Sequence, residues 1–293
     1  MPKIRPHISR PRYGEITQGT VFNCAFACRY EKCEVFGLSI TARCDVAQDK
    51  YPILNYIPIV MLRDWLNRDG LDILVEQELK EQSGKLGSML RQANLSPSLP
   101  LSVPLTAIAD THFPIGIGNK NQNSAAKKFR EHVVLVEEFK NITGVGDTDI
   151  LYSWFQDKRP KHVEDLVKRL SRHQVLGYYL LEEIWPDEEE NIGYVCLLRE
   201  VTTLLRSVAK ELGRGLSSTK YEELCSETKN STGLSIAQGE LAMPVSLIGS
   251  PTIEHVLQLF SNLFGRIGVA DPQDEVIQRI IGHCLSGDLG GNK

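Results

Sequence analysis

The chain has 293 residues, 42% of them hydrophobic and 24% charged, so it can bury a substantial core, which excludes a wholly disordered protein. A net charge of −4 excludes a protein that coats nucleic acid through its overall charge. No apolar run is long enough to cross a membrane, and the N-terminal segment lacks the apolar centre of a secretory signal. We therefore expect a cytoplasmic protein with no membrane partner.

The first 60 residues predict short β-strands. Residues 20–26, 33–44 and 51–60 are rich in Val, Ile, Phe, Tyr and Thr, and turn-forming or charged residues separate them. Three or four strands of this length fit a small, partly open barrel. We therefore predict a small N-terminal β-barrel-like module over residues 1–60.

A helical period replaces the strand pattern after residue 60. Apolar residues recur at helical intervals between Leu71 and Leu90, which predicts a helix with a break near Gly84 and Gly87. Residues 96–123 contain four prolines and no helical period, so we expect a loop or an extended crossing segment.

An internal boundary is placed in this Pro-rich segment. It separates a helical connector with its Pro-rich loop, residues 61–110, from a helical α+β domain, residues 111–293. The glycines and the lysine of the segment before residue 124 do not follow the order of a P-loop, and a flexible loop is expected there.

The remaining chain alternates helical and strand-like patterns. Helices are expected at 124–142, 150–157 and 161–172, and the apolar runs 175–184 and 192–201 predict a β-hairpin.

Three more helices are expected toward the C-terminus. Residues 199–212 look helical, and residues 213–239 are polar and read as a surface segment. Ser250 and Pro251 begin a strongly apolar helix, and a second helix follows from Asp271 to Cys284. The predicted fold class is therefore α+β, with the small β-barrel-like module followed by a mainly helical domain with a β-hairpin.

Four of the seven cysteines are clustered near the N-terminus. Cys24, Cys28, Cys33 and Cys44 could place four thiolates around a zinc ion, since structural zinc sites use four Cys or His ligands. The spacing lacks the two tight knuckles of a zinc ribbon, and thiols in strand-like sequence are commonly small core residues. Reduced core thiols and no metal are the expectation, with zinc as the alternative.

Cys44 and Asp45 form the main candidate for catalysis. A thiol and a carboxylate at the end of a strand would lie at the lip of the β module, but Asp45 would raise the pKa of the thiol rather than activate it. Arg43 would offset that effect, and His112 or His132 would supply a base if the fold brought it close. The alternative is that Asp45 forms a turn while Cys44 packs. No protease, nuclease, kinase or dinucleotide signature is present, and no cofactor is expected.

Polar residues follow one side of the predicted C-terminal helix. Glu254, His255, Gln258 and Arg266 recur at helical intervals beside the apolar stripe, which predicts either a binding site or a solvated face.

Basic residues gather in two places, at 127–130 and 158–161. They would bind nucleic acid if both clusters converged on one face, whereas solvated helix ends are the simpler interpretation.

Two segments, together under a fifth of the chain, resemble a group of poorly characterised bacterial proteins that are often encoded beside phage-defence genes. Residues 37–60 resemble their pattern of an apolar strand, a Thr-x-x-Cys-Asp motif and a second strand that ends in Pro-apolar-Val. This pattern is carried here by Thr41, Cys44, Asp45 and Pro58. Residues 250–272 resemble their Ser-Pro-x-Ile-Glu-His helix. That helix is represented here by Ser250, Pro251, Glu254, His255, Gln258, Phe260, Phe264, Arg266 and Gly268.

The resemblance implies a non-catalytic sensor, adaptor or regulatory subunit of a multi-protein anti-phage defence system, whose partner is another protein of that system. Two alternatives stay open from the residues themselves. One is a hydrolase or transferase with its site around Cys44 and Asp45, and the other is a nucleic-acid-binding module.

Overall fold

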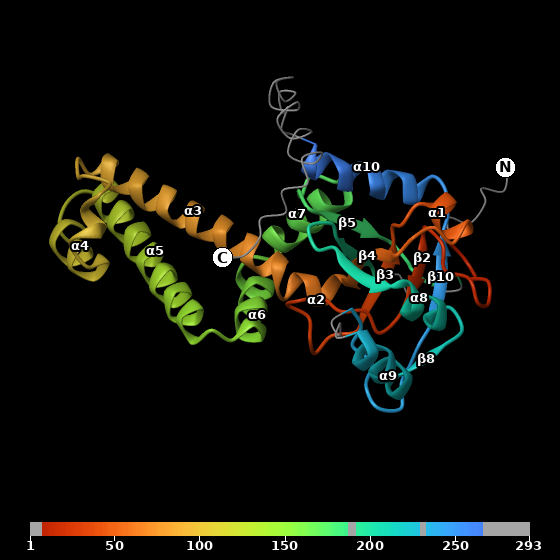
Figure 1. The fold of residues 1–293 in the computed structure, drawn as a ribbon. Coiled ribbons are helices and arrows are strands. Elements are labelled where there is room, and N and C mark those ends of the chain that lie inside the picture. Colours follow the sequence, from red (N-terminus) through yellow and green to blue (C-terminus); the bar gives the residue numbers. More distant parts are fainter. Residues whose placement is uncertain (1–7, 187–191, 229–232, 266–293) are drawn as a thin grey trace, which may run out of the picture.

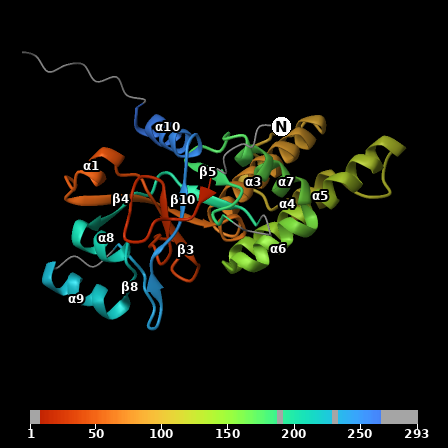
Figure 2. The ribbon, with the colours of Figure 1, turned by 90° about the vertical axis from the view of Figure 1, so that its right-hand side faces the viewer.

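The computed structural model describes residues 8–186, 192–228 and 233–265. Within these ranges the protein is a mixed α+β fold in which a curled antiparallel sheet forms the body (Figure 1). Two long helices and the segment that joins them project from this body as an arm, which both views show (Figures 1 and 2).

Eight strands form the main sheet, in the order β1-β10-β2-β3-β4-β6-β5, and β7 pairs with β4 beside this path. Their bounds are β1 (Ile8–Ser9), β2 (Thr20–Phe22), β3 (Val35–Ser39), β4 (Ile53–Met61), β5 (Tyr178–Leu181), β6 (Tyr194–Leu197), β7 (Thr202–Leu205) and β10 (Pro244–Ile248). A second small sheet pairs β8 (Leu216–Ser217) with β9 (Leu241–Ala242).

The main sheet combines three distant parts of the chain. The nine-residue strand β4 pairs with β3 on one side and with both β6 and β7 on the other, while β2 pairs with β3 and β10. The strands of residues 1–60 share one sheet with later strands, because β2 pairs with β10 and β4 pairs with β6 and β7.

The helices complete the fold. Their bounds are α1 (Arg43–Ala47), α2 (Leu62–Leu66), α3 (Asp69–Gln92), the 3-10 helix η1 (Leu99–Leu101), α4 (Leu105–His112), α5 (Lys120–Val145), α6 (Thr148–Lys158), α7 (Pro160–Ser171), α8 (Arg206–Leu212), α9 (Ser218–Thr228) and α10 (Thr252–Phe264). The expected helices on α3, α5, α6, α7 and α10 are confirmed, as is the hairpin, in which β5 pairs antiparallel with β6.

Several predicted elements differ from the structure. Helix α3 continues through Gly84 and Gly87, since the good helix formers around them outweigh a cost of about 1 kcal/mol per glycine. The predicted helix over 199–212 is a strand followed by the shorter α8, and the polar segment after it contains α9. The predicted second C-terminal helix, residues 271–284, lies outside the described residues.

The arm is formed by α3, α4 and α5. The inner ends of α3 and α5 pack into the main core through α6 and α7, whereas the outer ends enclose a small core of their own. The buried residues of this outer core are Leu86, Leu90, Ile108, Ala109, Phe113, Ala126, Phe129 and Val133. The segment expected to be a loop therefore contributes α4 to a packed end, and the predicted boundary at residue 110 falls inside one unit.

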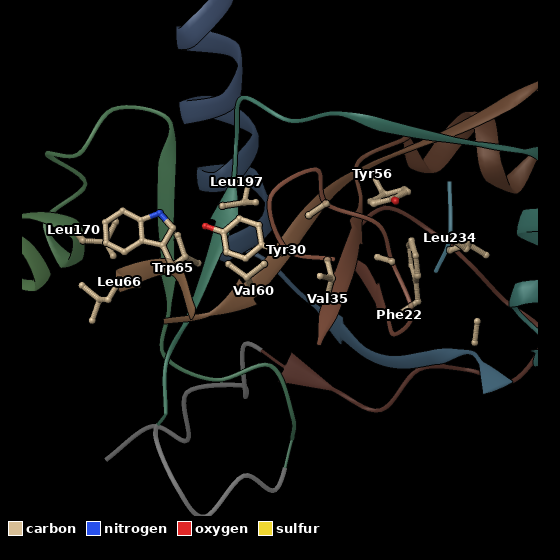
Figure 3. Close-up of a cluster of buried hydrophobic side chains, with 14 of the residues drawn as sticks. Phe22, Tyr30, Val35, Tyr56, Val60, Trp65, Leu66, Leu170, Leu197 and Leu234 are labelled. Carbon is tan, nitrogen blue, oxygen red and sulfur yellow. The ribbon is translucent and has the colours of Figure 1, made fainter. Parts of the chain in front are cut away.

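Apolar layers cover both faces of the sheet. On one face, Trp65 and Tyr30 pack near the arm and Phe22 packs against Tyr56, with ring centroids 5.1 Å apart (Figure 3). On the other face, Ile253 and Val256 of α10 close a second cluster over the strands. Helix α10 is therefore part of the core rather than an appendage.

Candidate functional site

The two segments that carry the resemblance meet in the fold. A guanidinium nitrogen of Arg43, on α1, lies 3.6 Å from Oε1 of Glu254 on α10. The Ser250 hydroxyl donates to the same oxygen at 2.6 Å. The Ser250 bond, with help from backbone N–H and Arg43, lowers the pKa of Glu254. Glu254 thus joins α10 to α1 and is occupied by internal partners.

His255 is also used within the fold. Its Nδ1 lies 3.3 Å from the hydroxyl of Tyr179 on β5, and the ring of His173 stacks on Tyr179 with centroids 4.6 Å apart. Burial raises the pKa of Tyr179 to about 12, and burial together with the charge of His255 lowers the pKa of His173. Three rings therefore fasten α10 to the sheet, and Tyr179 stays neutral at physiological pH.

Of the other two predicted binding residues, Gln258 and Arg266, the structure describes only Gln258. Gln258 is exposed on α10, and Arg266 lies outside the described residues. The polar side of α10 is therefore partly structural, and Gln258 is the one predicted contact residue in the described part of the chain that remains free on the surface.

Cys44 and Asp45 lie exposed on the short helix α1. The thiol sulfur is 3.7 Å from Oδ1 of Asp45, and the neighbouring Arg43 points its charge toward Glu254. His132, one of the proposed bases, is buried in the arm and contacts the backbone oxygen of Gln82 at 3.0 Å. Cys44 therefore has a carboxylate beside it, and among the residues that the structure describes neither His132 in the arm nor His112 on α4 contacts its thiol.

The early cysteines are not gathered around one point. Cys24 and Cys33 line an open cleft of about 530 Å³ beside β2 and β3, Cys28 is exposed outside its lining, and Cys44 lies on α1. In the described ranges, one group of three His, Cys, Asp or Glu side chains is close enough to share a metal ion, and it contains no cysteine. The zinc alternative therefore finds no support in the fold.

Selective alkylation tests the thiols directly. Burial and the charge of Glu240, whose Oε2 is 3.8 Å from the sulfur, raise the pKa of Cys24 to about 11. We expect Cys24 to react slowly at pH 8 with iodoacetamide, and its rate to rise with pH toward 11. Replacing Glu240 by Gln should lower the pH at which the alkylation rate of Cys24 is half its maximum. Mass spectrometry of the labelled peptides measures this rate. Cys44 and Cys28 are both exposed and should react at similar rates, and a far faster reaction of Cys44 would favour the enzyme alternative.

The group with metal-ligand spacing forms an ion-pair network at the base of the arm. The donor atoms of Glu78, Glu81 and His162 lie within 4.8 Å of one another. Arg159 binds Glu78 through two hydrogen bonds of 2.9 and 3.0 Å, and the two ring nitrogens of His162 face different carboxylates. Arg159 already supplies the positive charge that a metal would bring. We therefore interpret the network as a set of ion pairs that joins α3 to α7.

The two basic clusters do not form a common groove of free arginines. Arg130 donates to the backbone oxygens of Phe113 and Ala109 and to Asp110, which ties α5 to α4. Arg159 is held by Glu78. The arginine of each cluster is therefore engaged within the fold and is not free to contact a phosphate.

The sequence did not single out the large aliphatic side chains that are exposed at the end of the arm. We call residues 93–130 the arm tip. Leu101 is 88% exposed, Ile115 is 64% exposed and Ile117 is 71% exposed. Large aliphatic side chains presented to solvent at the end of a projection are typical of interaction sites.

Hydrogen bonds hold the loop that presents the two isoleucines. Asn123 accepts from Gly116 N–H at 2.8 Å and donates to the oxygen of Gly118 at 3.1 Å. Asn119 and Gln122 form a reciprocal capping box at the start of α5. Within the expected loop the chain therefore forms a hydrogen-bonded turn, and the glycines, asparagines and Gln122 in the sequence were the signal for it.

Comparison with protein-family models, with curated proteins and with solved structures gave no match for this chain. Among the helices that the structure describes, none is both long and apolar enough to cross a membrane.

Proposed function

We propose that this protein is a non-catalytic binding subunit, a sensor or adaptor, that captures another protein through its helical arm. The main observation behind this proposal is the helical arm. Helix α3 has 24 residues, which gives a rod about 36 Å long, and α5 runs back beside it with 26 residues. A projection of this length reaches beyond the body, and its end presents aliphatic side chains that are largely exposed to solvent.

The design of the arm agrees with this role. Its tip has a separate small core, so the exposed side chains rest on a packed support rather than on a loose loop. Its base is fixed to α7 by the Glu78–Arg159 pair. A packed arm with an apolar end suits recognition of a partner, because little conformational freedom is lost on binding.

The wider setting rests on the resemblance of residues 37–60 and 250–272 to defence-associated bacterial proteins. In this proposal the protein works in the cytoplasm beside other proteins of an anti-phage system. The curled sheet, a loose counterpart of the expected β-barrel-like module, is the scaffold from which the arm extends. The polar residues of the two motifs then serve folding, since Arg43, Glu254 and His255 contact one another or the sheet.

A quantitative pull-down from the native host tests the proposal. Ile115→Ser combined with Ile117→Ser should weaken partner capture at least about tenfold, because two side chains would lose their burial. Val145→Ser is the matched control, since Val145 is 66% exposed but lies at the opposite end of α5. All variants should keep their stability within about 0.5 kcal/mol. Equal capture by all three proteins, or no stoichiometric protein with the wild type, would reject the arm as the binding element.

A further inference from the structure

We propose that the arm tip docks into an apolar groove with an acidic rim on the partner protein. This inference rests on the proposed function and adds the chemistry of the partner. It follows from three properties of the tip: its exposed aliphatic side chains, its local charge and its fixed loop.

The tip is basic on a chain that is acidic overall. Residues 93–130 contain four basic side chains and one acidic side chain, whereas the whole chain has 33 basic and 37 acidic residues. These basic residues are Lys120, Lys127, Lys128 and Arg130. The charge of the tip thus opposes that of the remaining chain, which favours an anionic partner.

Two of these lysines are free to meet such a partner. In the described ranges no ion pair joins Lys120 or Lys128 to an acidic side chain, and both are exposed. Lys127 makes a loose pair with Glu131 at 3.9 Å, and Arg130 is bound to Asp110 at 3.0 Å. Lys120 directly follows the loop of Ile115 and Ile117, so positive charge borders the apolar surface.

The fixed loop favours a protein groove over a lipid surface. Gly116 and Gly118 adopt positive φ angles of 82° and 110°, and a Cβ on Gly118 would come within 2.4 Å of the Gln122 amide. With the hydrogen bonds from Asn123, this conformation sets the positions of both isoleucines before any contact. A fluid bilayer gains little from that order, whereas a shaped groove binds a preorganised loop at low entropic cost.

The partner recovered in the pull-down, titrated with the full-length protein, tests the inference. Lys120→Glu combined with Lys128→Glu should weaken binding at least about tenfold, as should raising the salt from about 50 to about 500 mM. Lys140→Glu with Lys161→Glu is the control of equal charge change away from the tip. A carbodiimide, which joins a lysine amine to a neighbouring carboxylate with loss of water, should link Lys120 or Lys128 to Asp or Glu of the partner.

Binding of the partner that is insensitive to both lysine changes, or carbodiimide links that avoid the tip, would overturn this inference and leave the proposed function standing. Failure to recover any partner would reject both. Binding to vesicles of phosphatidylglycerol and phosphatidylcholine is the last measurement. If the vesicles retain the wild type but not the isoleucine variant, the tip is a lipid anchor and the proposal of a protein groove is wrong.

Discussion

Replacing Arg159 by Met should lower the free energy of unfolding by about 3–5 kcal/mol, because it leaves a buried carboxylate without its counter-charge. The side chain of Glu78 is only 1% exposed, and Arg159 contributes both hydrogen bonds of a bidentate pair to it. Urea unfolding at neutral pH measures the loss. Because the pair joins α3 to the start of α7, the arm should lose its fixed attachment before the sheet unfolds.

Lowering the pH should likewise reduce the free energy of unfolding of the wild type. Burial alone would raise the pKa of Glu78, but hydrogen bonds from Arg159 and Gln82, with the charges of Arg159 and His162, hold it below its ordinary value. A carboxyl group with a depressed pKa stabilises the fold fully above the ordinary glutamate pKa. This stabilisation is lost as the pH falls below that value and through the depressed pKa of the folded state. The Arg159→Met protein should therefore show a weaker acid dependence than the wild type.

Two comparisons separate charge from packing at this site. Combining Glu78→Met with Arg159→Met should recover most of the stability, since an apolar pair can replace a buried ion pair. Lys168→Met on the same helix breaks an exposed pair with Glu164 and should cost no more than about 1 kcal/mol. If the double variant were as unstable as Arg159→Met alone, lost packing rather than an unpaired charge would be the cause.

Replacing Gly19 by Ala should cost about 3 kcal/mol or more, since neither the backbone angle nor the space admits a side chain. Its φ is +90°, and a Cβ would lie 2.3 Å from the backbone oxygen of Ile248. Gly19 donates to the oxygen of Ser39 and accepts from Ile248 N–H, both at 2.8 Å. The residue therefore joins the N-terminal strands to β10, and its side chain would push them apart.

Gly14 supplies the control for this change. It also has a positive φ, +76°, but a Cβ there meets nothing within 4 Å, so Gly14→Ala should cost only about 1 kcal/mol. Thermal and urea unfolding of both variants give the comparison. Similar losses from the two would show that backbone strain alone matters and that the close approach to Ile248 is tolerated.

Local patterns were enough to predict much of the secondary structure. The apolar periods on α3, α5 and α10 and the paired runs of β5 and β6 report contacts within one element or between neighbours, which a single sequence contains. The Pro-rich segment was misread because its four prolines and its lack of a helical period indicated a loop, although Pro104 directly precedes α4.

Long-range contacts could not be predicted in the same way. The pairing of β2 with β10, and of β4 with β6 and β7, joins positions far apart in the chain and leaves no local pattern. For the same reason the residues Glu254 and His255 looked like a free binding face, whereas Arg43 and Tyr179 occupy them. The exposed Ile115 and Ile117 were missed because an apolar residue in a loop looks the same in sequence whether it is buried or presented to solvent.

Photo-crosslinking in the native host tests the central claim most directly. Benzoylphenylalanine is placed at position 117 on the arm tip, at 145 at the other end of α5, or at 258 on α10. The arm-capture account predicts one major protein adduct from position 117 and little from the other two positions. An adduct that forms from position 258 and not from 117 would contradict it and return the interface to the C-terminal helix.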